Sequence, residues 1–516
     1  LAGNQLVANA GADITYTLTL EANAAITYTI VGTKHQDYGV ITYGTPDWST
    51  LSKTTISPDD PIASGTFGSS IAISGNYAIV GGSSANTAWI FEKTGLGGWS
   101  QVSVLESSHS ANAFGYSVAI DGDYAIVGAL TSAGPGVSPG YTYGSAHIFK
   151  RNGSGAWNEE VMLQPTEKLV GSNGYTRFGW SVAIDGDYVA IGATNNSFYR
   201  IPGGGASAFG SAHIYKRDSD GNWNSFDDLI AFNSDFTNRT GGNTNFGITM
   251  AIQGDELFVG SGGSVSQGGM TVHVFKMNSA GDEFEPSQWI QQVAVDDGFS
   301  KYGLAVNGDY MIVGAIYDDH NNNSFDNTGA AFIYARNSSG VWTQQKHIYV
   351  QDPAVNDEFG WSVAIHGDRA IVCSRYKKGP DNAYQGVAVV YERNGTNWNQ
   401  IQYLVPTSYG DQFGYAVAMD GDAWLVGEIY EDSGGVVYSY GGNIPIILNP
   451  TPLDFTDDIL TIQNSIDASD TDPVSFTLPV NNEMAALNVT NFSGTGTISY
   501  TISATGVTTI TGTIVD

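Results

Sequence analysis

The segment Phe114-Gly-Tyr-Ser-Val-Ala-Ile-Asp-Gly-Asp-Tyr-Ala-Ile-Val-Gly-Ala129 contains the pattern that recurs along this 516-residue chain. Its two short apolar runs flank an Asp-Gly pair, which predicts a tight β-hairpin because glycine accepts the positive φ of such a turn. The pattern recurs at intervals of roughly 60 residues, and this regularity predicts a repeat architecture. Related copies start with Phe-Gly at Phe67, Phe178, Phe246, Phe359 and Phe413.

A seventh copy is less regular than the others. It is anchored by Gly308-Asp309 and carries Ser300-Lys301 in place of Phe-Gly. Seven small units of this kind favour a closed ring of sheets, because a single core does not suit a chain of this length. A second small residue follows the turn glycine of every unit, namely Gly81, Gly128, Gly192, Gly260, Gly314, Cys373 and Gly427.

Each complete unit is expected to contain four strands, and the last of them follows a tryptophan. The seventh unit stops after its third strand, at 436–440, and lacks both the tryptophan and the fourth strand. Residues 48–56 have the form of that missing strand, so we expect them to complete the seventh unit and close the ring. In the second unit we predict strands at 117–120, 124–127, 145–150 and 160–163.

The two ends of the chain lie outside the repeats, and their alternation of apolar and threonine residues predicts half-buried strands. These strands are expected at 14–20, 25–31, 459–462, 474–478, 498–502 and 507–515. The sequence therefore predicts an all-β chain with an N-terminal β arm at 1–47, a seven-bladed β-propeller at 48–442 and a C-terminal β-sandwich-like module at 443–516. Either the arm folds onto the module of its own chain, or it inserts into the next subunit and builds a head-to-tail filament.

The composition is strongly acidic, and this limits the partners. The chain has 51 Asp and Glu against 20 Lys and Arg, a formal net charge of −31. Binding to nucleic acid needs clustered cations, so nucleic acid is not an expected partner. No apolar run reaches the about 18 residues that a membrane helix needs, so membrane insertion is not expected either. The single Cys373 excludes a disulfide framework and is expected to be a buried, inert thiol.

The Phe-Gly and Gly-Ala ends make these units resemble FG-GAP repeats, which form the seven-bladed propeller of the integrin α head. The resemblance covers about residues 48–441. It implies an extracellular or cell-surface protein that binds other proteins or glycans, and it implies calcium binding in many members. The integrin-type calcium loop is not matched here, because the first two strands are joined only by turns such as Asp121-Gly122-Asp123.

One other loop has the spacing of a calcium ligand set, although it lacks the full EF-hand pattern. Oxygen-bearing side chains alternate along this loop at Asp319, Asn321, Asn323 and Asp326. We therefore keep calcium binding and a solvated loop as two interpretations. His147, His213 and His273, by contrast, share one position in the third strands that other units fill with apolar residues, so packing is expected there.

Loops on one face of the ring form the predicted binding surface. In a four-stranded antiparallel unit, the loops between the second and third strands and the crossings between units lie on the same face. Because long loops on a rigid scaffold usually carry binding, we expect a protein or glycan ligand there. Acidic candidates for contact with this ligand are Asp318, Asp357, Asp411, Glu431 and Asp432.

No nucleophile-elbow, zinc-protease or phosphate-loop motif occurs in the sequence. We therefore expect a non-catalytic protein that serves adhesion or builds an extracellular structure. A polysaccharide-binding lectin, or a glycosidase or lyase that uses paired loop carboxylates, is the alternative. Asn-x-Ser/Thr sequons, which accept glycans in secreted eukaryotic proteins, start at Asn152, Asn195, Asn238, Asn322, Asn337, Asn394, Asn488 and Asn491.

Overall fold

The computed structural model consists of strands and turns throughout the residues that it describes. Its backbone is described for residues 6–8, 14–20, 25–32, 40–43, 47–60, 62, 65–94, 98–109, 111–132, 142–165, 175–195, 210–233, 235, 244–263, 270–291, 298–319, 327–379, 384–406, 412–421, 423–430, 434–443, 446–449, 460–467, 474–478, 485–493, 497–504 and 510–515. Of these, side chains are described only between residues 53 and 440. Within the described ranges, no helix is long and apolar enough to cross a membrane.

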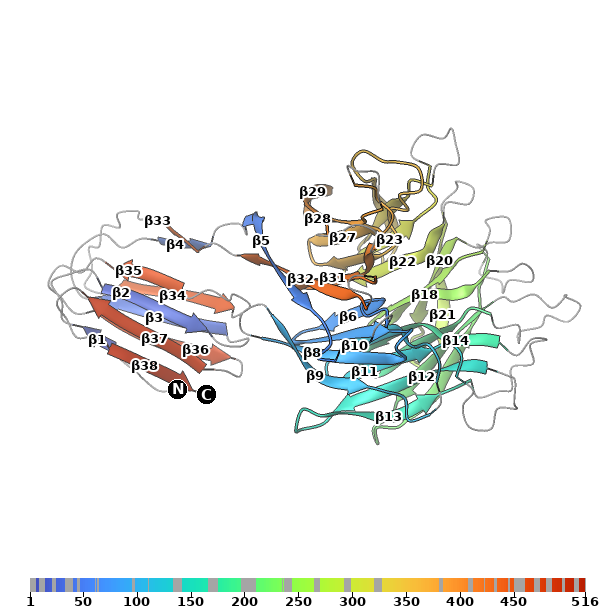
Figure 1. Ribbon diagram of the computed structural model, residues 1–516, viewed down its shortest axis with the longest axis horizontal. Helices are drawn as coiled ribbons and strands as arrows, with labels where there is room; N and C mark the ends of the chain where they lie inside the picture. The colour runs from blue at the N-terminus through green and yellow to red at the C-terminus, as the bar shows by residue number, and fades with distance from the viewer. Residues whose placement is uncertain are drawn as a thin grey trace, which may run out of the picture. The chain divides into compact units, whose positions relative to one another are not determined.

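The repeat region forms seven four-stranded antiparallel units, with the strands of each unit side by side (Figure 1). The first three units contain β6 (Ser70–Ser74), β7 (Tyr77–Gly82), β8 (Thr87–Lys93), β9 (Trp99–Leu105), β10 (Phe114–Asp121), β11 (Tyr124–Ala129), β12 (Thr142–Arg151), β13 (Trp157–Leu163), β14 (Tyr175–Asp185), β15 (Tyr188–Ala193), β16 (Ser211–Arg217) and β17 (Trp223–Leu229). The second and third units are joined by a short parallel pairing of β12 with β14.

The remaining four units follow the same plan. The fourth to sixth contain β18 (Phe246–Gln253), β19 (Glu256–Ser261), β20 (Thr271–Met277), β21 (Phe284–Gln291), β22 (Phe299–Asn307), β23 (Tyr310–Ala315), β24 (Ala330–Arg336), β25 (Trp342–Ile348), β26 (Val363–His366), β27 (Arg369–Ser374), β28 (Val387–Asn394) and β29 (Asn397–Leu404). The seventh contains β30 (Phe413–Asp420), β31 (Ala423–Glu428), β32 (Val436–Asn443) and, as its outermost strand, β5 (Asp47–Ile56).

The first strands of the units pack against one another in a closed ring. Contacts run from β6 through β10, β14, β18, β22, β26 and β30 back to β6. Because β5 supplies the fourth strand of the last unit, each of the seven units has four strands. The prediction of an all-β propeller closed by an N-terminal strand is therefore confirmed.

The predicted hairpin turns join the first and second strands. Their glycines, from Gly75 in the first unit to Gly421 in the seventh, have φ values between 54° and 59°. The aspartate after the glycine forms an ion pair with a cation near the end of the third strand of its own unit, so this carboxylate belongs to the turn. These pairs are Asp123–Arg151, Asp187–Arg217, Asp255–Lys276, Asp309–Arg336 and Asp368–Arg393.

The turns also fasten each unit to the next. The side chain at the end of the first strand accepts a hydrogen bond from the turn glycine of the following unit, as Asp121 does from the Gly186 N–H at 2.8 Å. Asp420 accepts the Gly75 N–H at 2.6 Å and thereby joins the seventh unit to the first. Equivalent bonds run from Gly122 to Ser74, Gly254 to Asp185, Gly308 to Gln253 and Gly367 to Asn307.

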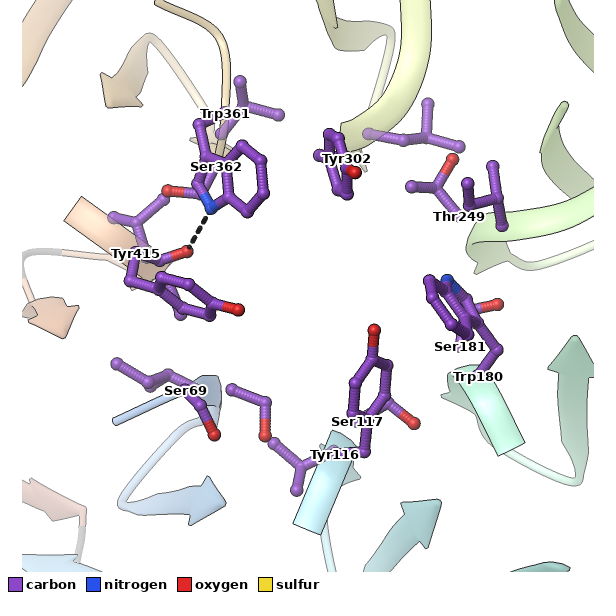
Figure 2. Close-up of a pocket in the computed structure, with 18 of the residues that line it drawn as sticks. Ser69, Tyr116, Ser117, Trp180, Ser181, Thr249, Tyr302, Trp361, Ser362 and Tyr415 are labelled. Carbon is purple, nitrogen blue, oxygen red and sulfur yellow. Dashed lines mark hydrogen bonds between the residues drawn. The ribbon is translucent and has the colours of Figure 1, made fainter. Parts of the chain in front are cut away.

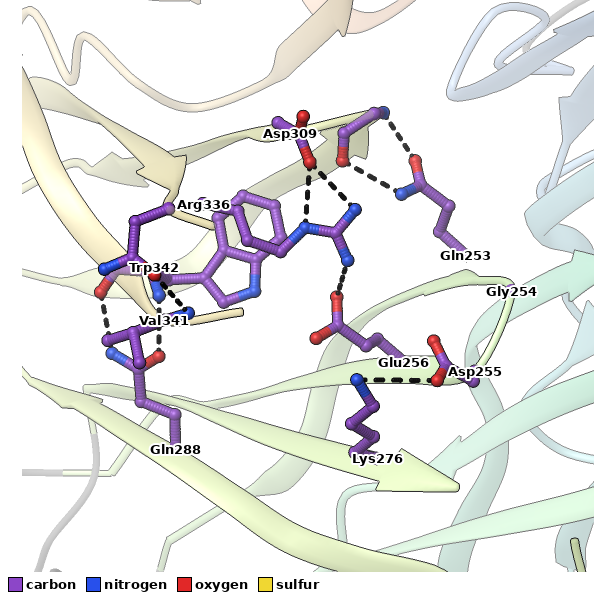
Figure 3. A network of polar contacts seen from close by, with 12 residues as sticks. Gln253, Gly254, Asp255, Glu256, Lys276, Gln288, Asp309, Arg336, Val341 and Trp342 are labelled. Carbon is purple, nitrogen blue, oxygen red and sulfur yellow. Dashed lines mark hydrogen bonds and ion pairs between the residues drawn. The ribbon is translucent and has the colours of Figure 1, made fainter. Parts of the chain in front are cut away.

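Arg336 adds a second connection between the fourth and fifth units (Figure 3). Its guanidinium lies 2.9 Å from Asp309 within the fifth unit and 2.8 Å from the buried Glu256 of the fourth. Burial raises the pKa of Glu256, and the positive charge of Arg336 opposes that rise. In the same interface, Gln288 donates to the Trp342 carbonyl at 2.7 Å and accepts the Trp342 N–H at 2.9 Å. These side chains join two units that already meet at the centre of the ring.

Two glycines in each unit other than the fifth and sixth allow neighbouring units to approach closely. The Phe of each Phe-Gly pair is buried, and its glycine has a φ between 84° and 93°. A Cβ on Gly314 in β23 would lie 1.9 Å from the carbonyl oxygen of Gly360 in the next unit, a distance that no side chain allows. A hydroxyl on the first strand binds the same carbonyl, as Ser117 does with the Gly179 oxygen at 2.8 Å. The same close approach recurs at Gly81, Gly128, Gly192 and Gly427.

The fifth unit differs from the alignment predicted from the sequence. Phe299 and Ser300 take the place of Phe-Gly, because Phe299 pairs with Ala315 at the end of the second strand. Ser300 accordingly has a φ of 61°, and its carbonyl accepts the Thr249 hydroxyl at 2.8 Å. The assignment of Ser300-Lys301 to this place was wrong by one residue. Nine residues, rather than eight, separate Phe299 from its turn glycine Gly308.

The two ends of the chain share two four-stranded sheets. Their strands are β1 (Leu6–Ala8), β2 (Ile14–Leu20), β3 (Ala25–Gly32), β34 (Leu460–Asp467), β35 (Val474–Leu478), β36 (Ala485–Ser493), β37 (Thr497–Ala504) and β38 (Ile510–Val515). One sheet has the order β1-β36-β3-β34 and the other β35-β2-β37-β38, so β2 and β3 are inner strands (Figure 1). A separate pairing joins β4 (Val40–Tyr43) to β33 (Ile446–Asn449). Within one chain, the N-terminal strands thus pair with C-terminal strands in both sheets.

Substituting Gly314 with alanine tests the close approach between units. Because the added Cβ would meet the backbone of Gly360, Gly314→Ala should lower the free energy of unfolding by at least about 2 kcal/mol. Cys373→Ala is the matched control, because the sixth unit already holds a Cβ at this position. Cys373 is fully buried, and burial raises the pKa of its thiol to about 12. Equal denaturant midpoints for Gly314→Ala and the parent chain would refute the constraint.

Candidate functional site

A cavity of about 520 Å³ lies on the axis of the ring (Figure 2). All seven units line it, each with residues at the start of its first strand. Ser83 and Arg375, which directly follow second strands, line the same cavity. These strand ends carry the crossings between units and the loops between second and third strands, so the cavity opens toward the face predicted to bind a ligand.

The position directly after Phe-Gly supplies much of the cavity wall. The Phe is buried, the glycine bends the backbone, and the next side chain reaches the axis. In four units this side chain is aromatic, namely Tyr116, Trp180, Trp361 and Tyr415. The sequence carries the signal as Phe-Gly-Tyr and Phe-Gly-Trp, which our emphasis on acidic loop residues overlooked.

The aromatic side chains form two groups around the cavity (Figure 2). Trp361 stacks on Tyr302, with ring centroids 4.1 Å apart and planes 25° apart, and lies 5.7 Å from the ring of Tyr415. Tyr116 and Trp180 form the second group, with centroids 5.0 Å apart. The Trp361 indole N–H donates to the Tyr415 carbonyl at 3.0 Å and fixes the orientation of the indole. The cavity therefore offers aromatic faces that are held in place before a ligand arrives.

Both cations of the wall lie against aromatic rings. The Arg375 guanidinium is 3.2 Å from the Trp361 ring centroid, and its Nε is 3.1 Å from a Glu358 carboxylate oxygen. The Lys301 ammonium lies 4.7 Å from the Tyr317 ring centroid and donates to the Tyr317 hydroxyl at 3.1 Å. Cation–π contacts contribute about 0.5–2 kcal/mol each, so they help to hold both cations at the wall.

Among the residues that the structure describes, the cavity wall contains no carboxylate and no histidine. Burial raises the pKa of Tyr116, with a further rise from the nearby hydroxyl of Tyr415. Burial also raises the pKa of Tyr415, and the positive charge of Arg375 opposes it. Both phenols are therefore neutral at physiological pH. The described wall can stack on a ligand, form hydrogen bonds and attract negative charge, but it offers no carboxylate or imidazole as a general base.

The acidic residues predicted for the ligand face have other contacts. Asp318 is 6% exposed and lies 3.4 Å from His347, and Asp357 is 1% exposed and lies 2.8 Å from Lys377. Burial raises the pKa of Asp357, and the hydrogen bond from Lys377 opposes that rise. Neither carboxylate is exposed for a ligand, because Asp318 is buried beside the partly exposed His347 and Asp357 forms a buried pair with Lys377. The other three, Asp411, Glu431 and Asp432, lie outside the described residues.

The predicted calcium loop is described only at its first residue. The Asp319 carboxylate accepts the Asn327 N–H at 3.0 Å. The remaining members, Asn321, Asn323 and Asp326, lie outside the described residues. Elsewhere in the described part of the chain, no group of three or more His, Cys, Asp or Glu side chains could hold a metal ion.

The predicted sequons differ in exposure. Asn152, Asn337 and Asn394 are exposed beside turns between third and fourth strands, whereas Asn195 is half-buried. Because those turns lie at the end of the sheets opposite the cavity mouth, glycans on the three exposed residues would leave the cavity open. Of the others, Asn488 and Asn491 lie in β36, and Asn238 and Asn322 lie outside the described residues.

Two units contain a buried Ser–His–acid arrangement. In the second unit, the His147 ring lies 2.8 Å from the Ser145 hydroxyl and 2.7 Å from the Glu159 carboxylate. Burial opposes ionisation of Glu159, but hydrogen bonds, chiefly from His147, lower its pKa to about 2. Both serine hydroxyls belong to residues with 0% exposure, so the arrangements tie third strands to fourth strands rather than meet a substrate. The third unit repeats the arrangement with Ser211, His213 and Asp228.

The closed ring of four-stranded units defines a β-propeller with a candidate binding cavity on its axis. Four segments match the family model for the FG-GAP repeat, at residues 99–149, 164–215, 342–391 and 398–440. The chain therefore contains FG-GAP repeats, and the resemblance predicted from the sequence is confirmed. Such repeats are typical of extracellular proteins and are usually non-catalytic.

Several solved structures resemble the chain at low identity. A candidate 6-phosphogluconolactonase from Bacteroides fragilis is 12% identical with a TM-score of 0.41, over 71% of this chain and 94% of that one. The WD40 repeats of RRP9 are 8% identical with a TM-score of 0.45, over 78% of this chain and 100% of theirs. Sqt1 from Saccharomyces cerevisiae is 11% identical with a TM-score of 0.40, over 84% and 98%. These similarities carry no functional argument, and no curated protein sequence matches the chain.

Proposed function

We propose that this chain is a non-catalytic, extracellular binding protein that holds a glycan in its axial cavity. In this role it serves adhesion at a cell surface or within an extracellular structure. The observation that carries the proposal is the wall of the cavity, in which fixed aromatic faces surround about 520 Å³ of space. Pockets of about 300–1,000 Å³ with aromatic walls and a few polar groups are typical of sites for small ligands.

A sugar ring suits this wall for physical reasons. One face of a pyranose presents C–H groups that bury apolar surface against an aromatic ring, while the hydroxyls at its edge form hydrogen bonds. Trp180, Trp361 and Tyr302 supply such faces, and the phenols of Tyr116 and Tyr415 supply donors and acceptors on the same wall. A folded protein partner would bury about 800 Å² on each side, far more than a narrow axial cavity provides.

The same wall argues against cleavage of the glycan. A glycosidase needs two carboxylates that flank the scissile bond, and the described wall has none. The two Ser–His–acid arrangements do not line the cavity, and their serines are buried. We therefore favour a lectin-like adhesive role over a glycosidase or lyase.

We further propose that subunits assemble through the N-terminal β arm. β2 and β3 are inner strands of two sheets whose other long strands come from the C-terminal region. The same pairings form when the arm of one subunit inserts into the module of the next, so the exchange replaces contacts by identical ones. Head-to-tail joins of this kind do not close and would produce a filament. A filament presents many glycan sites at once, and this raises avidity without new contacts.

Calcium binding at the loop 319–326 is a further part of the proposal, supported by the spacing of its oxygen ligands. If the ion binds the folded chain only, 100 times its dissociation constant stabilises the fold by about 2.7 kcal/mol. A chelator should then lower the melting temperature of the parent chain. The double variant Asp319→Ala, Asp326→Ala should melt at one temperature with and without chelator. An unchanged melting curve of the parent in chelator would rule out this site.

Removing Tyr302 tests the glycan site. Tyr302 stacks on Trp361 at the cavity and is 37% exposed, so Tyr302→Ala should weaken glycan binding about tenfold and leave the fold intact. Tyr403→Ala is the matched control, because Tyr403 is 38% exposed on an outermost strand. Glycan-array screening followed by calorimetry measures both variants. Equal affinities for Tyr302→Ala and the parent would exclude the cavity, and absence of any saccharide ligand would refute the proposed function.

Deleting residues 1–40 tests assembly. The deletion removes β1 to β3 and therefore the inner strand of each terminal sheet. We expect the full chain to form filaments at high concentration, and the deleted chain to stay monomeric with an intact propeller. Light scattering, electron microscopy and a melting curve report assembly and folding separately. If the full chain remains monomeric with its arm protected from protease, strand exchange between subunits does not occur.

A further inference from the structure

We infer that the glycan is anionic, a saccharide that carries carboxylate or sulfate groups. This inference rests on the proposed function and names the ligand of the same cavity. The observation is the charge of the wall. Its formally charged side chains among the described residues are Lys301 and Arg375, and both are cations. The chain as a whole has 20 Lys and Arg against 51 Asp and Glu. The positive charge of the described wall is therefore opposite in sign to the net charge of the chain.

Arg375 is held in a form that suits an anion. Its guanidinium stacks on Trp361, its Nε contacts Glu358, and the ring of Tyr376 lies 4.4 Å away. These contacts fix the plane of the group and use one of its five donors. The two terminal nitrogens have no hydrogen-bond partner in the part of the chain that the structure describes. A fixed guanidinium with free terminal nitrogens is the arrangement that binds carboxylate or sulfate through two parallel hydrogen bonds.

Two further cations lie near the same aromatic side chains. Lys301 contacts the Tyr317 hydroxyl and, in the described structure, no carboxylate. Arg177 is exposed, with its guanidinium 5.2 Å from the ring of Trp180. Among the described residues, Glu358 is the carboxylate that contacts this group of three cations, and it contacts Arg375 alone.

The cations of the opposite face are arranged differently. There, each arginine at the end of a third strand is paired with a turn aspartate of its own unit. Those charges are neutralised and fasten the ring. Arg177, Lys301 and Arg375 lie instead beside aromatic rings. Of these three, Arg177 and Lys301 have no acidic partner among the described residues. A ligand that is both a ring and an anion would use the two features together.

An acidic sugar has this combination of groups. Its ring stacks on an aromatic face, and its carboxylate or sulfate projects from the edge of the ring. The wall has the complementary order, with Lys301 5.4 Å from the ring of Tyr302 and Arg375 5.8 Å from the ring of Tyr415. An acidic peptide would satisfy the cations but would leave most of the aromatic surface without a partner. We therefore assign the charge preference to a saccharide.

A paired glycan array tests the inference on the full chain. Uronate-bearing oligosaccharides are printed beside their methyl esters, and sulfated ones beside their desulfated forms, so that the members of a pair have the same sugar backbone and differ in charge at one group. A poly-glutamate peptide is included on the same surface. We expect the charged member of a pair to bind at least tenfold more tightly, with an affinity that falls as salt is added. The pairs also show whether carboxylate or sulfate is the group that is recognised.

Charge-removing variants assign the preference to the cavity. The double variant Lys301→Gln, Arg375→Gln should lose the difference between the charged and uncharged members of a pair while it still binds the uncharged one. Lys346→Gln removes a charge from an exposed position on β25 and should keep the full preference. Melting curves of all variants exclude misfolding as the cause.

The possible results separate the inference from the proposed function. If glycans bind without regard to charge, or if the neutral members bind better, the anionic preference is wrong and the glycan site stands. If the peptide binds and no acidic saccharide does, the ligand is a protein segment and the inference is overturned. If neither saccharide nor peptide binds, the proposed function fails as well. If the double variant keeps the preference for charged saccharides, residues outside the cavity recognise the negative charge, and the assignment to Lys301 and Arg375 is wrong.

Discussion

The propeller depends on one backbone contact that is repeated from unit to unit. In every unit except the sixth, which has Cys373, a glycine near the end of the second strand lets the backbone carbonyl of the next unit approach to a distance that a side chain would forbid, as between Gly314 and Gly360. A hydroxyl from the first strand binds the same carbonyl where Ser or Thr is present, as at Ser117. Because this contact brings the innermost strands together, the Phe is buried between sheets and the ring closes. The next side chain is then directed to the axis, so the packing between units and the wall of the cavity are set by neighbouring residues of one motif.

The ring could be predicted from the sequence because its signals are local and repeated. An Asp-Gly pair between apolar runs specifies a hairpin by itself, and a missing fourth strand in the last unit is visible when the seven copies are aligned. The fifth unit was misaligned because the extra residue after Phe299 is accommodated by an irregular pairing that only the register reveals. The inner positions of β2 and β3 could not be predicted either. Alternating residues indicate a half-buried strand, but its neighbours depend on segments far away in the chain.

The site was harder to predict than the fold. In a chain with 51 acidic residues, loop carboxylates are the obvious candidates for ligand contacts. Asp318 and Asp357 are nevertheless buried beside His347 and Lys377. These partners are more than 15 residues away in the sequence, so the pairs could not be predicted from it. The aromatic wall is visible in the sequence only when the residue after each Phe-Gly is compared across units. Even then, whether that side chain packs in a sheet or reaches the axis depends on the φ of the glycine before it, which is a property of the folded backbone.

One position in each repeat contributes a different side chain to the wall of the cavity, and this position can vary from unit to unit. In this chain the residue two positions after the leading Phe is Ser69, Tyr116, Trp180, Ile248, Lys301, Trp361 or Tyr415. The seven side chains differ widely in size and polarity, whereas the contacts that hold the ring together are made by the Phe and glycine beside them. A single substitution at this position can therefore alter one part of the cavity wall while the Phe and glycine that join the units stay in place. A gene that encodes such repeats can explore new ligands in small, separate steps.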